Sequence, residues 1–220
     1  GNSMNFLPSG SIPYQQYILG PTDSLATLLK GYGYETRAFH PGEQTSWQRN
    51  IAYPRLGFDS FKCGEDMDVP QTEEHGYVSD DSDFEQIIWE FEHKDESTPL
   101  FLFNVTIQNH GSYTVEDYPA EVQLADEPGA YPKAEQYLTL ANKTDEAFKK
   151  LIDYFSAQTE PTILVMFGDH QPSVEQEFLD KAYGVTQDEM TMAQYMDKFK
   201  VPFIIWANYP LTGDSTKITS

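Results

Sequence analysis

The chain has 220 residues, 39% of them hydrophobic and 14% aromatic, which is sufficient for a folded core and excludes a disordered chain. Its 35 acidic and 14 basic residues give a formal net charge of −21, which excludes nucleic acid binding by charge and direct docking on anionic lipid. The single cysteine, Cys63, excludes an internal disulfide and a cysteine-rich metal cluster.

The first forty residues predict one helix and one strand. Thr22 or Asp23 can cap a short helix, and Gly31 is expected to end that helix in a left-handed conformation. Residues 34–39 then read as a strand, which places His40 at the carboxyl end of that strand.

The next segment predicts two helices and a second strand. Thr45 or Ser46 can cap a short helix that breaks at Pro54, and a polar, irregular stretch follows. Ser82 begins a capping-box pattern, and apolar residues at helical spacing come after it. The apolar run 100–107 predicts a strand that ends just before Asn109 and His110.

The second half begins with a loop of about twenty residues, long enough to be functional rather than a plain connection. Residues 137–155 carry the strongest helical pattern in the chain. The apolar run 162–167 predicts a buried central strand of a parallel sheet, followed directly by Gly168, Asp169 and His170. Residues 201–206 predict a fourth strand.

Helices and strands alternate along the chain, which predicts an α/β fold with a parallel sheet flanked by helices. Ligands of such sheets bind beyond the carboxyl ends of the strands. His40, His110 and His170 each follow a predicted strand, so we expect them to converge with Asp169 in one cleft. Asp oxygen and His nitrogen are ligands for zinc or manganese. The other two histidines lie in acidic surroundings and are expected to be solvated.

Each candidate residue also has a structural explanation. Asp169 could cap the turn that follows it, and His110 stands in Asn-His-Gly, which is a good turn sequence. Arg49 could pair with surface carboxylates, although its planar fork also suits a phosphate. Trp47 could belong to the core or form one wall of a pocket.

Several segments together resemble one known family, and their order and spacing make the resemblance specific. The segments are Asn2–Tyr14, His40–Arg49 with its His, Trp and Arg, Gly57–Phe61, Asn109-His110, Gly168-Asp-His170 and Val201–Trp206. The chain resembles the extracellular domain of lipoteichoic acid synthases and related phosphoglycerol transferases, in the alkaline phosphatase/sulfatase superfamily. The resemblance covers nearly the whole chain, so 1–220 is expected to be a single, partial catalytic domain.

The resemblance implies a role for each matching residue. Asp169 and His170 would bind one divalent ion, with manganese expected and magnesium or zinc using overlapping ligand types. The glycerol-phosphate group would be held by His40, Trp47, Arg49 and His110. The donor would be a glycerophospholipid head group and the acceptor a polyglycerolphosphate chain, with no nucleic acid partner.

The chain also departs from the family pattern. The catalytic threonine and first metal-binding glutamate of the family lie upstream of the matched region, so the nucleophile is expected to be absent from this chain. The chain would then be truncated at its N-terminus and at its C-terminus, inactive alone and weak in metal binding. Gly42, with Glu43 beside it, stands where the family carries an acidic residue that contacts substrate.

The expected function is therefore that of a fragment of a metal-dependent phosphoglycerol transferase, which acts in cell-envelope polymer synthesis through a phospho-threonine. The resemblance implies a parent protein anchored in a bacterial membrane by preceding segments, with this part on the extracytoplasmic face. One alternative is a sulfatase or other phosphoesterase of the same superfamily. The other is a non-catalytic acidic interaction module.

Overall fold

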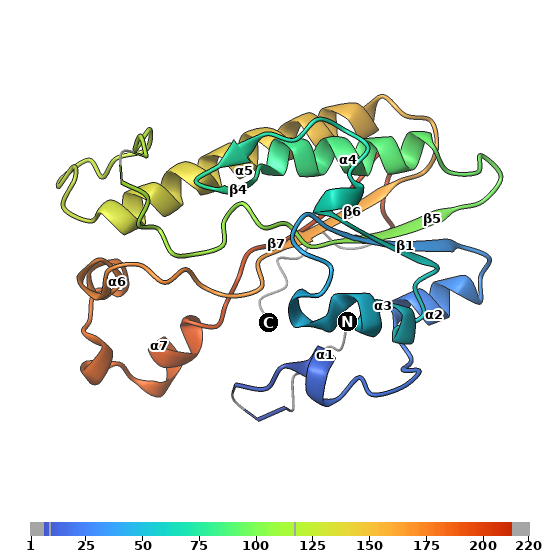
Figure 1. The fold of residues 1–220 in the computed structure, drawn as a ribbon. Helices are drawn as coiled ribbons and strands as arrows, with labels where there is room; N and C mark the ends of the chain where they lie inside the picture. Colours follow the sequence, from blue (N-terminus) through green and yellow to red (C-terminus); the bar gives the residue numbers. More distant parts are fainter. Residues whose placement is uncertain (1–6, 9, 117, 213–220) are drawn as a thin grey trace. The chain divides into compact units, whose positions relative to one another are not determined.

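In a computed structural model, the described residues are 7–8, 10–116 and 118–212 (Figure 1). The chain divides into two units, residues 1–108 and 109–220. The first unit contains a three-stranded sheet in the order β2-β1-β5, and the second contains a two-stranded sheet of β6 and β7.

The sheet of the first unit is parallel. Its central strand β1 (Glu35–His40) pairs on one side with β2 (Ser60–Cys63) and on the other with β5 (Leu100–Asn104). In this register Ala38 lies opposite both Phe61 and Phe103. This confirms the predicted parallel sheet, and the three strands end at the same edge.

Helices cover both faces of this sheet (Figure 1). One face carries α2 (Leu25–Lys30) and α3 (Arg49–Arg55), and α4 (Asp80–Glu92) lies on the other. The shorter elements of the unit are α1 (Pro13–Gln16), η1 (Ser46–Gln48), η2 (Gly64–Asp66), β3 (Glu73–Glu74) and β4 (Tyr77–Val78). The predicted fold class, an α/β protein with a parallel sheet flanked by helices, is therefore confirmed.

The α3 face of the sheet is aromatic. Tyr53 of α3 is fully buried, and its ring makes edge-on contacts with Phe58, Phe61 and Phe103 at centroid distances of 5.7, 4.8 and 6.2 Å. Phe58 also stacks with Phe101 at 6.0 Å. Burial of such large rings contributes strongly to stability, so this cluster holds α3 against the strands.

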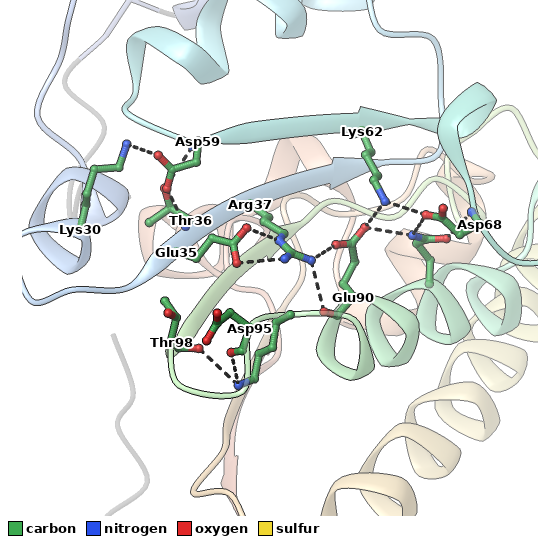
Figure 2. Close-up of polar contacts among 12 residues, drawn as sticks. Lys30, Glu35, Thr36, Arg37, Asp59, Lys62, Asp68, Glu90, Asp95 and Thr98 are labelled. Carbon is green, nitrogen blue, oxygen red and sulfur yellow. Dashed lines mark hydrogen bonds and ion pairs between the residues drawn. The ribbon is translucent and has the colours of Figure 1, made fainter.

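The α4 face is held by buried charges instead (Figure 2). Glu90 of α4 is 2% exposed and lies between Arg37 of β1 at 2.5 Å and Lys62 of β2 at 2.8 Å. Gln86 donates to the second Glu90 oxygen at 3.0 Å. Hydrogen bonding to Glu35 is the main reason that the pKa of Arg37 is raised. The guanidinium of Arg37 therefore stays positively charged over the whole pH range in which the protein is folded. The network ties α4 to two strands at once.

The helix starts differ from the predicted ones by a few residues. Ser24, not Thr22 or Asp23, caps α2, and its hydroxyl accepts from the amide of Ala26 at 3.0 Å. Gly31 has a φ of −61° and is not left-handed. Ser79 caps α4, because the Ser82 hydroxyl accepts a hydrogen bond from the amide of Thr72 at 2.8 Å instead.

The second unit is built on a long helix, α5 (Pro132–Ser156), which confirms the strongest predicted helix. Its buried face includes Ala134, Leu140, Ala147, Phe148, Leu151 and Phe155. The remaining elements are β6 (Ile163–Phe167), α6 (Gln176–Tyr183), η3 (Gln187–Glu189), α7 (Met192–Asp197) and β7 (Phe203–Ala207). None of the helices in the described ranges is both long and apolar enough to cross a membrane.

The prediction that 162–167 forms a buried central strand of a parallel sheet is wrong. Strand β6 pairs with β7 in the antiparallel direction, with Val165 opposite Ile205. Ile163, Val165 and Phe167 share one side of β6 and are each at least 50% exposed. An apolar run indicates that a strand forms, but the direction of its neighbour depends on the path of residues 168–202, which brings the chain back antiparallel.

Candidate functional site

His40 ends β1 and is 3% exposed. Its Nδ1 lies 2.7 Å from the carbonyl oxygen of Val105, so Nδ1 carries the proton and donates it there. A Cβ at Gly42 would lie only 2.6 Å from Nε2 of His40 and 3.2 Å from Ile107. The absence of a side chain at position 42 therefore allows the imidazole its present orientation.

The loops that follow β1 and β2 meet beside His40. The amide of Gly64 donates to the carbonyl of Gly42 at 3.3 Å, and a Cβ at Gly64 would lie 2.2 Å from the carbonyl oxygen of Pro41. An open hollow of about 380 Å³ lies at this edge and is lined by Pro41, Gly42, Glu43, Gly64, Glu65 and Gln71. It occupies the position at which parallel sheets bind ligands.

Trp47 and Arg49 lie at the start of α3, where the backbone is strained. Trp47 and Gln48 both have a φ of 58°, and each such non-glycine residue costs about 1–3 kcal/mol. The Trp47 side chain is 50% exposed. Arg49 is half-buried, and its Nη1 donates to the carbonyl of Ser46 at 3.2 Å. Such strain accumulates at functional sites, so it supports a role for this turn.

His40 and α3 share one face of the sheet. Side chains alternate along β1, so His40 projects to the same side as Ala38. Ala38 is opposite Phe61 and Phe103, whose rings contact Tyr53 of α3. The structure thus places His40 on the sheet face that α3 covers; Arg49 begins that helix and Trp47 lies in the turn before it.

In the second unit, the segment after Gln108 is held by buried polar groups. Asn109 donates to the Thr144 hydroxyl of α5 at 2.8 Å, and the Tyr113 hydroxyl donates to the carbonyl of Asn109 at 2.7 Å. His110 is exposed, with Nδ1 2.7 Å from the carbonyl of Gly111. Burial raises the pKa of Tyr113 to about 12, and the charges of Tyr137 and Asp169 add to the shift.

The two expected metal ligands are adjacent and exposed, with side-chain exposures of 82% for Asp169 and 74% for His170. Nδ1 of His170 lies 2.9 Å from the carbonyl of Gln171, so Nδ1 carries the proton and donates it to that oxygen, which leaves the lone pair on Nε2. Nε2 is 3.7 Å from Oδ2 of Asp169. Two ligands about 2.1 Å from one ion at a near-tetrahedral angle lie about 3.4 Å apart, so this pair fits a shared ion.

The pair is a partial ligand set. Within residues 7–8, 10–116 and 118–212 no cluster of three or more His, Cys, Asp or Glu side chains is arranged to hold a metal. His40 belongs to the first unit, and His110 and His170 belong to the second. Convergence of the three imidazoles stays a prediction.

Three features were missed by the sequence analysis. His75, expected to be solvated, is half-buried with Nε2 2.5 Å from the carbonyl of Gln108. Asp80 and Asp83 at the start of α4 are both fully buried, and Asn104 donates to Asp83. Burial, and then the charge of Asp80, raise the pKa of Asp83 well above its usual range. The third feature is the buried Tyr53, one helical turn after Arg49. The only signal in the sequence was that a tyrosine stands here while the neighbouring aromatic residues are phenylalanines.

A family model described as Sulfatase matches residues 2–213. A relative in Rhizobium meliloti (strain 1021), whose name assigns it to cyclic beta-1,2-glucan modification, is 35% identical over 94% of this chain and 33% of its own length. The chain spans between 25% and 33% of the length of the four curated relatives that it matches.

Two solved structures share the fold. The lipoteichoic acid synthase LtaP from Listeria monocytogenes has a TM-score of 0.67 at 20% identity, over 88% of this chain and 48% of that one. The Streptococcus pyogenes phosphoglycerol transferase GacH, in complex with sn-glycerol-1-phosphate, has a TM-score of 0.62 at 22% identity, over 80% and 44%. The resemblance to lipoteichoic acid synthases is confirmed. With the matched region covering almost all of its residues, the chain belongs to the sulfatase family.

Proposed function

We propose that this chain supplies the phosphate-binding face and part of the metal site of a phosphoglycerol transferase. The observation that carries the proposal is the position of His40 at the end of β1 on the sheet face covered by α3, with Trp47 and Arg49 at the start of that helix. An arginine fork offsets the charge on the equatorial oxygens of a phosphoryl group in its transition state. With Nδ1 of His40 donating to Val105, Nε2 would donate to a phosphoryl oxygen only when it also carries a proton. The fold it shares with GacH, which was solved with sn-glycerol-1-phosphate, supports that substrate class.

Asp169 and His170 would hold a divalent ion, with manganese expected first. A further fold neighbour, the periplasmic domain of EcEptC from Escherichia coli, was solved in complex with zinc at a TM-score of 0.50, and zinc uses the same ligand types. When bound, such an ion polarises a phosphoryl oxygen. His170 contributes a neutral imidazole whose tautomer is held by Gln171, and Asp169 contributes the negative charge.

The proposed reaction has two displacements on phosphorus. A threonine oxygen, supplied by residues outside this chain, attacks the phosphate of a glycerophospholipid; the bond to diacylglycerol breaks and diacylglycerol leaves with a proton. An acceptor hydroxyl then attacks the phospho-threonine, and the threonine oxygen leaves and regains a proton. Arg49 and His40 would bind the phosphate through both steps, which orients it for in-line attack.

The acceptor is proposed to be a neutral glucan, in preference to the polyglycerolphosphate that the family resemblance first implies. A net charge of −21 opposes the approach of a polyanionic chain, and carboxylates such as Glu43 and Glu65 accept hydrogen bonds from sugar hydroxyls. The relative named for cyclic beta-1,2-glucan modification supports the same choice. Such chemistry would take place on the extracytoplasmic face of a bacterial membrane.

The test uses the intact gene product that contains this chain, with manganese and a phosphatidylglycerol labelled in its head group. Transfer of the label to cyclic glucan is the expected result, with less transfer to polyglycerolphosphate. Aryl sulfate hydrolysis in the absence of label transfer would instead establish the sulfatase alternative. If neither substrate reacts under conditions in which the protein is folded and binds manganese, the non-catalytic alternative holds.

A further inference from the structure

The strongest unexplained group in the first unit is the hydroxyl of Tyr53. The side chain is 0% exposed, and in the described part of the chain its hydroxyl makes no hydrogen bond. A buried hydroxyl without a partner costs about 1–3 kcal/mol, and such groups are rare in folded proteins. Phenylalanine would avoid this cost, and the chain uses it at the neighbouring ring positions Phe58, Phe61 and Phe103. The tyrosine therefore requires an explanation beyond packing.

The position of this hydroxyl is fixed by the rings around it. Besides the three phenylalanines, Tyr14 of α1 contacts the Tyr53 ring edge-on at 5.6 Å. Four rings at 4.8–6.2 Å leave the Tyr53 ring little freedom to rotate or shift. Its oxygen is therefore a fixed point on the α3 face.

Arg49 is the charged side chain near this hydroxyl oxygen. Arg49 precedes Tyr53 by one helical turn of α3, so both side chains lie on the same side of the helix. Burial raises the pKa of Tyr53, the nearby Tyr14 hydroxyl raises it further, and the charge of Arg49 opposes both. The hydroxyl is thus close to the guanidinium and to the Tyr14 hydroxyl and stays protonated, although neither contact has the geometry of a full hydrogen bond in this structure.

Arg49 itself is only partly held. Its one hydrogen bond among the described residues joins Nη1 to the carbonyl of Ser46 at 3.2 Å. The turn that precedes it contains the left-handed residues Trp47 and Gln48, so the helix start does not by itself fix the long arginine side chain. Hydrogen bonds of functional groups are often long before substrate binds and shorten in the complex.

We propose that Tyr53 is a positioning residue for Arg49. When a phosphate engages the guanidinium, the Tyr53 oxygen accepts one N–H of Arg49, and the Tyr53 proton is donated to the Tyr14 oxygen. The remaining N–H groups of Arg49 are then directed at the phosphate. The inference rests on the proposed function, because it takes the ligand of Arg49 to be the donor phosphate.

The test is a double-mutant cycle in the intact gene product that contains this chain. Tyr53→Phe removes only the hydroxyl, and we expect about a tenfold loss in kcat/KM for phosphatidylglycerol and about a tenfold loss in affinity for sn-glycerol-1-phosphate, with Tm unchanged or raised. Tyr32→Phe removes a hydroxyl from a side chain that is 75% exposed and is the matched control with no expected effect. In an Arg49→Ala background, Tyr53→Phe is expected to cause no further loss.

Each outcome decides one question. Full affinity in Tyr53→Phe, a fall in its Tm of several degrees, or an equal loss in the Arg49→Ala background would overturn the positioning role. The unmodified protein could show no turnover while the double-mutant cycle still shows that Tyr53 and Arg49 act together in binding sn-glycerol-1-phosphate. This result would overturn phosphoglycerol transfer and support the role of Tyr53. Absence of glycerol phosphate binding by the unmodified protein would overturn both.

Discussion

The two units hold their expected site residues in opposite ways. In residues 1–108 the imidazole of His40 is 3% exposed and hydrogen-bonded to Val105, and the sheet beneath it is covered by helices on both faces. In residues 109–220 the side chains of Asp169 and His170 are 82% and 74% exposed and follow a two-stranded ribbon. The first arrangement is held by burial and hydrogen bonding within the protein itself. In the proposed metal site, the second would be ordered by an ion and further ligands.

The largest effect is expected where the first unit depends on buried charge. Glu90→Gln leaves Arg37 and Lys62 facing a neutral group, and breaking a buried pair in this way costs about 3 kcal/mol of unfolding free energy. Urea denaturation would show this as a lower midpoint. Asp153→Asn, which breaks the exposed Lys149 pair on α5, is the matched control and should leave the midpoint unchanged. Equal midpoints for both variants would contradict the dependence of the first unit on the buried charge of Glu90.

The next effect concerns the phosphate-binding face. Arg49→Ala should lower phosphoglycerol transfer about a hundredfold, because removing one strong donor to a developing charge costs that order of rate. The measurement is label transfer by the intact gene product, with Lys149→Ala as the control for loss of a positive charge. A loss below tenfold would remove Arg49 from the phosphate.

The second unit is tested through the ion that it is proposed to bind. Asp169→Asn removes the carboxylate charge while keeping the side-chain shape, and we expect at least about a tenfold loss in manganese affinity, since groups that only support a ligand already contribute that much. Isothermal titration of the intact gene product measures it. Asp197→Asn, on α7 in the same unit, is the control. Unchanged affinity in Asp169→Asn would show that this carboxylate is not a ligand.

The smallest effect lies at the start of α4. The pKa of Asp83 is higher in the folded protein than in the unfolded chain. The protonated carboxyl therefore contributes fully to the free energy of unfolding below the unfolded pKa near 4, and this contribution is lost as the pH rises through the folded pKa. Asp83→Asn mimics the protonated side chain and should stabilise the protein by about 1 kcal/mol at pH 8. At pH 4 it should have little effect. Thermal melts at both pH values measure the difference, and a variant that is less stable at pH 8 would argue against it.

The sequence predicts the first unit better than the second. Strand β1 and the position of His40 follow from the apolar run and the turn at Pro41-Gly42. Strand β2 was missed because it is only four residues long and carries the polar Ser60 and Lys62, which read as an irregular stretch. The long helix α5 was predicted because its apolar spacing persists over many turns.

The pairing of β6 with β7 could not be predicted in the same way. Both runs are apolar enough to form strands, but strand direction depends on the path of the connection between them, and that path has no local signature. The candidate residues His40 and Asp169-His170 could be proposed from the sequence because they follow strands, whereas Tyr53 could not. Its proposed role depends on the ring contact with Tyr14 and on the proximity of Arg49, which follow from the folded chain and not from the sequence pattern.

The left-handed pair Trp47 and Gln48 has a consequence for how this protein would respond to selection. Glycine adopts a positive φ without steric cost, so Gln48→Gly would relieve strain and emerge from a screen for heat resistance. The same change would widen the range of directions available to the indole and the guanidinium beside it, and the proposed phosphoglycerol transfer would fall as the melting temperature rose. A bulky residue kept in this conformation would therefore lower the melting temperature while it supports the proposed activity.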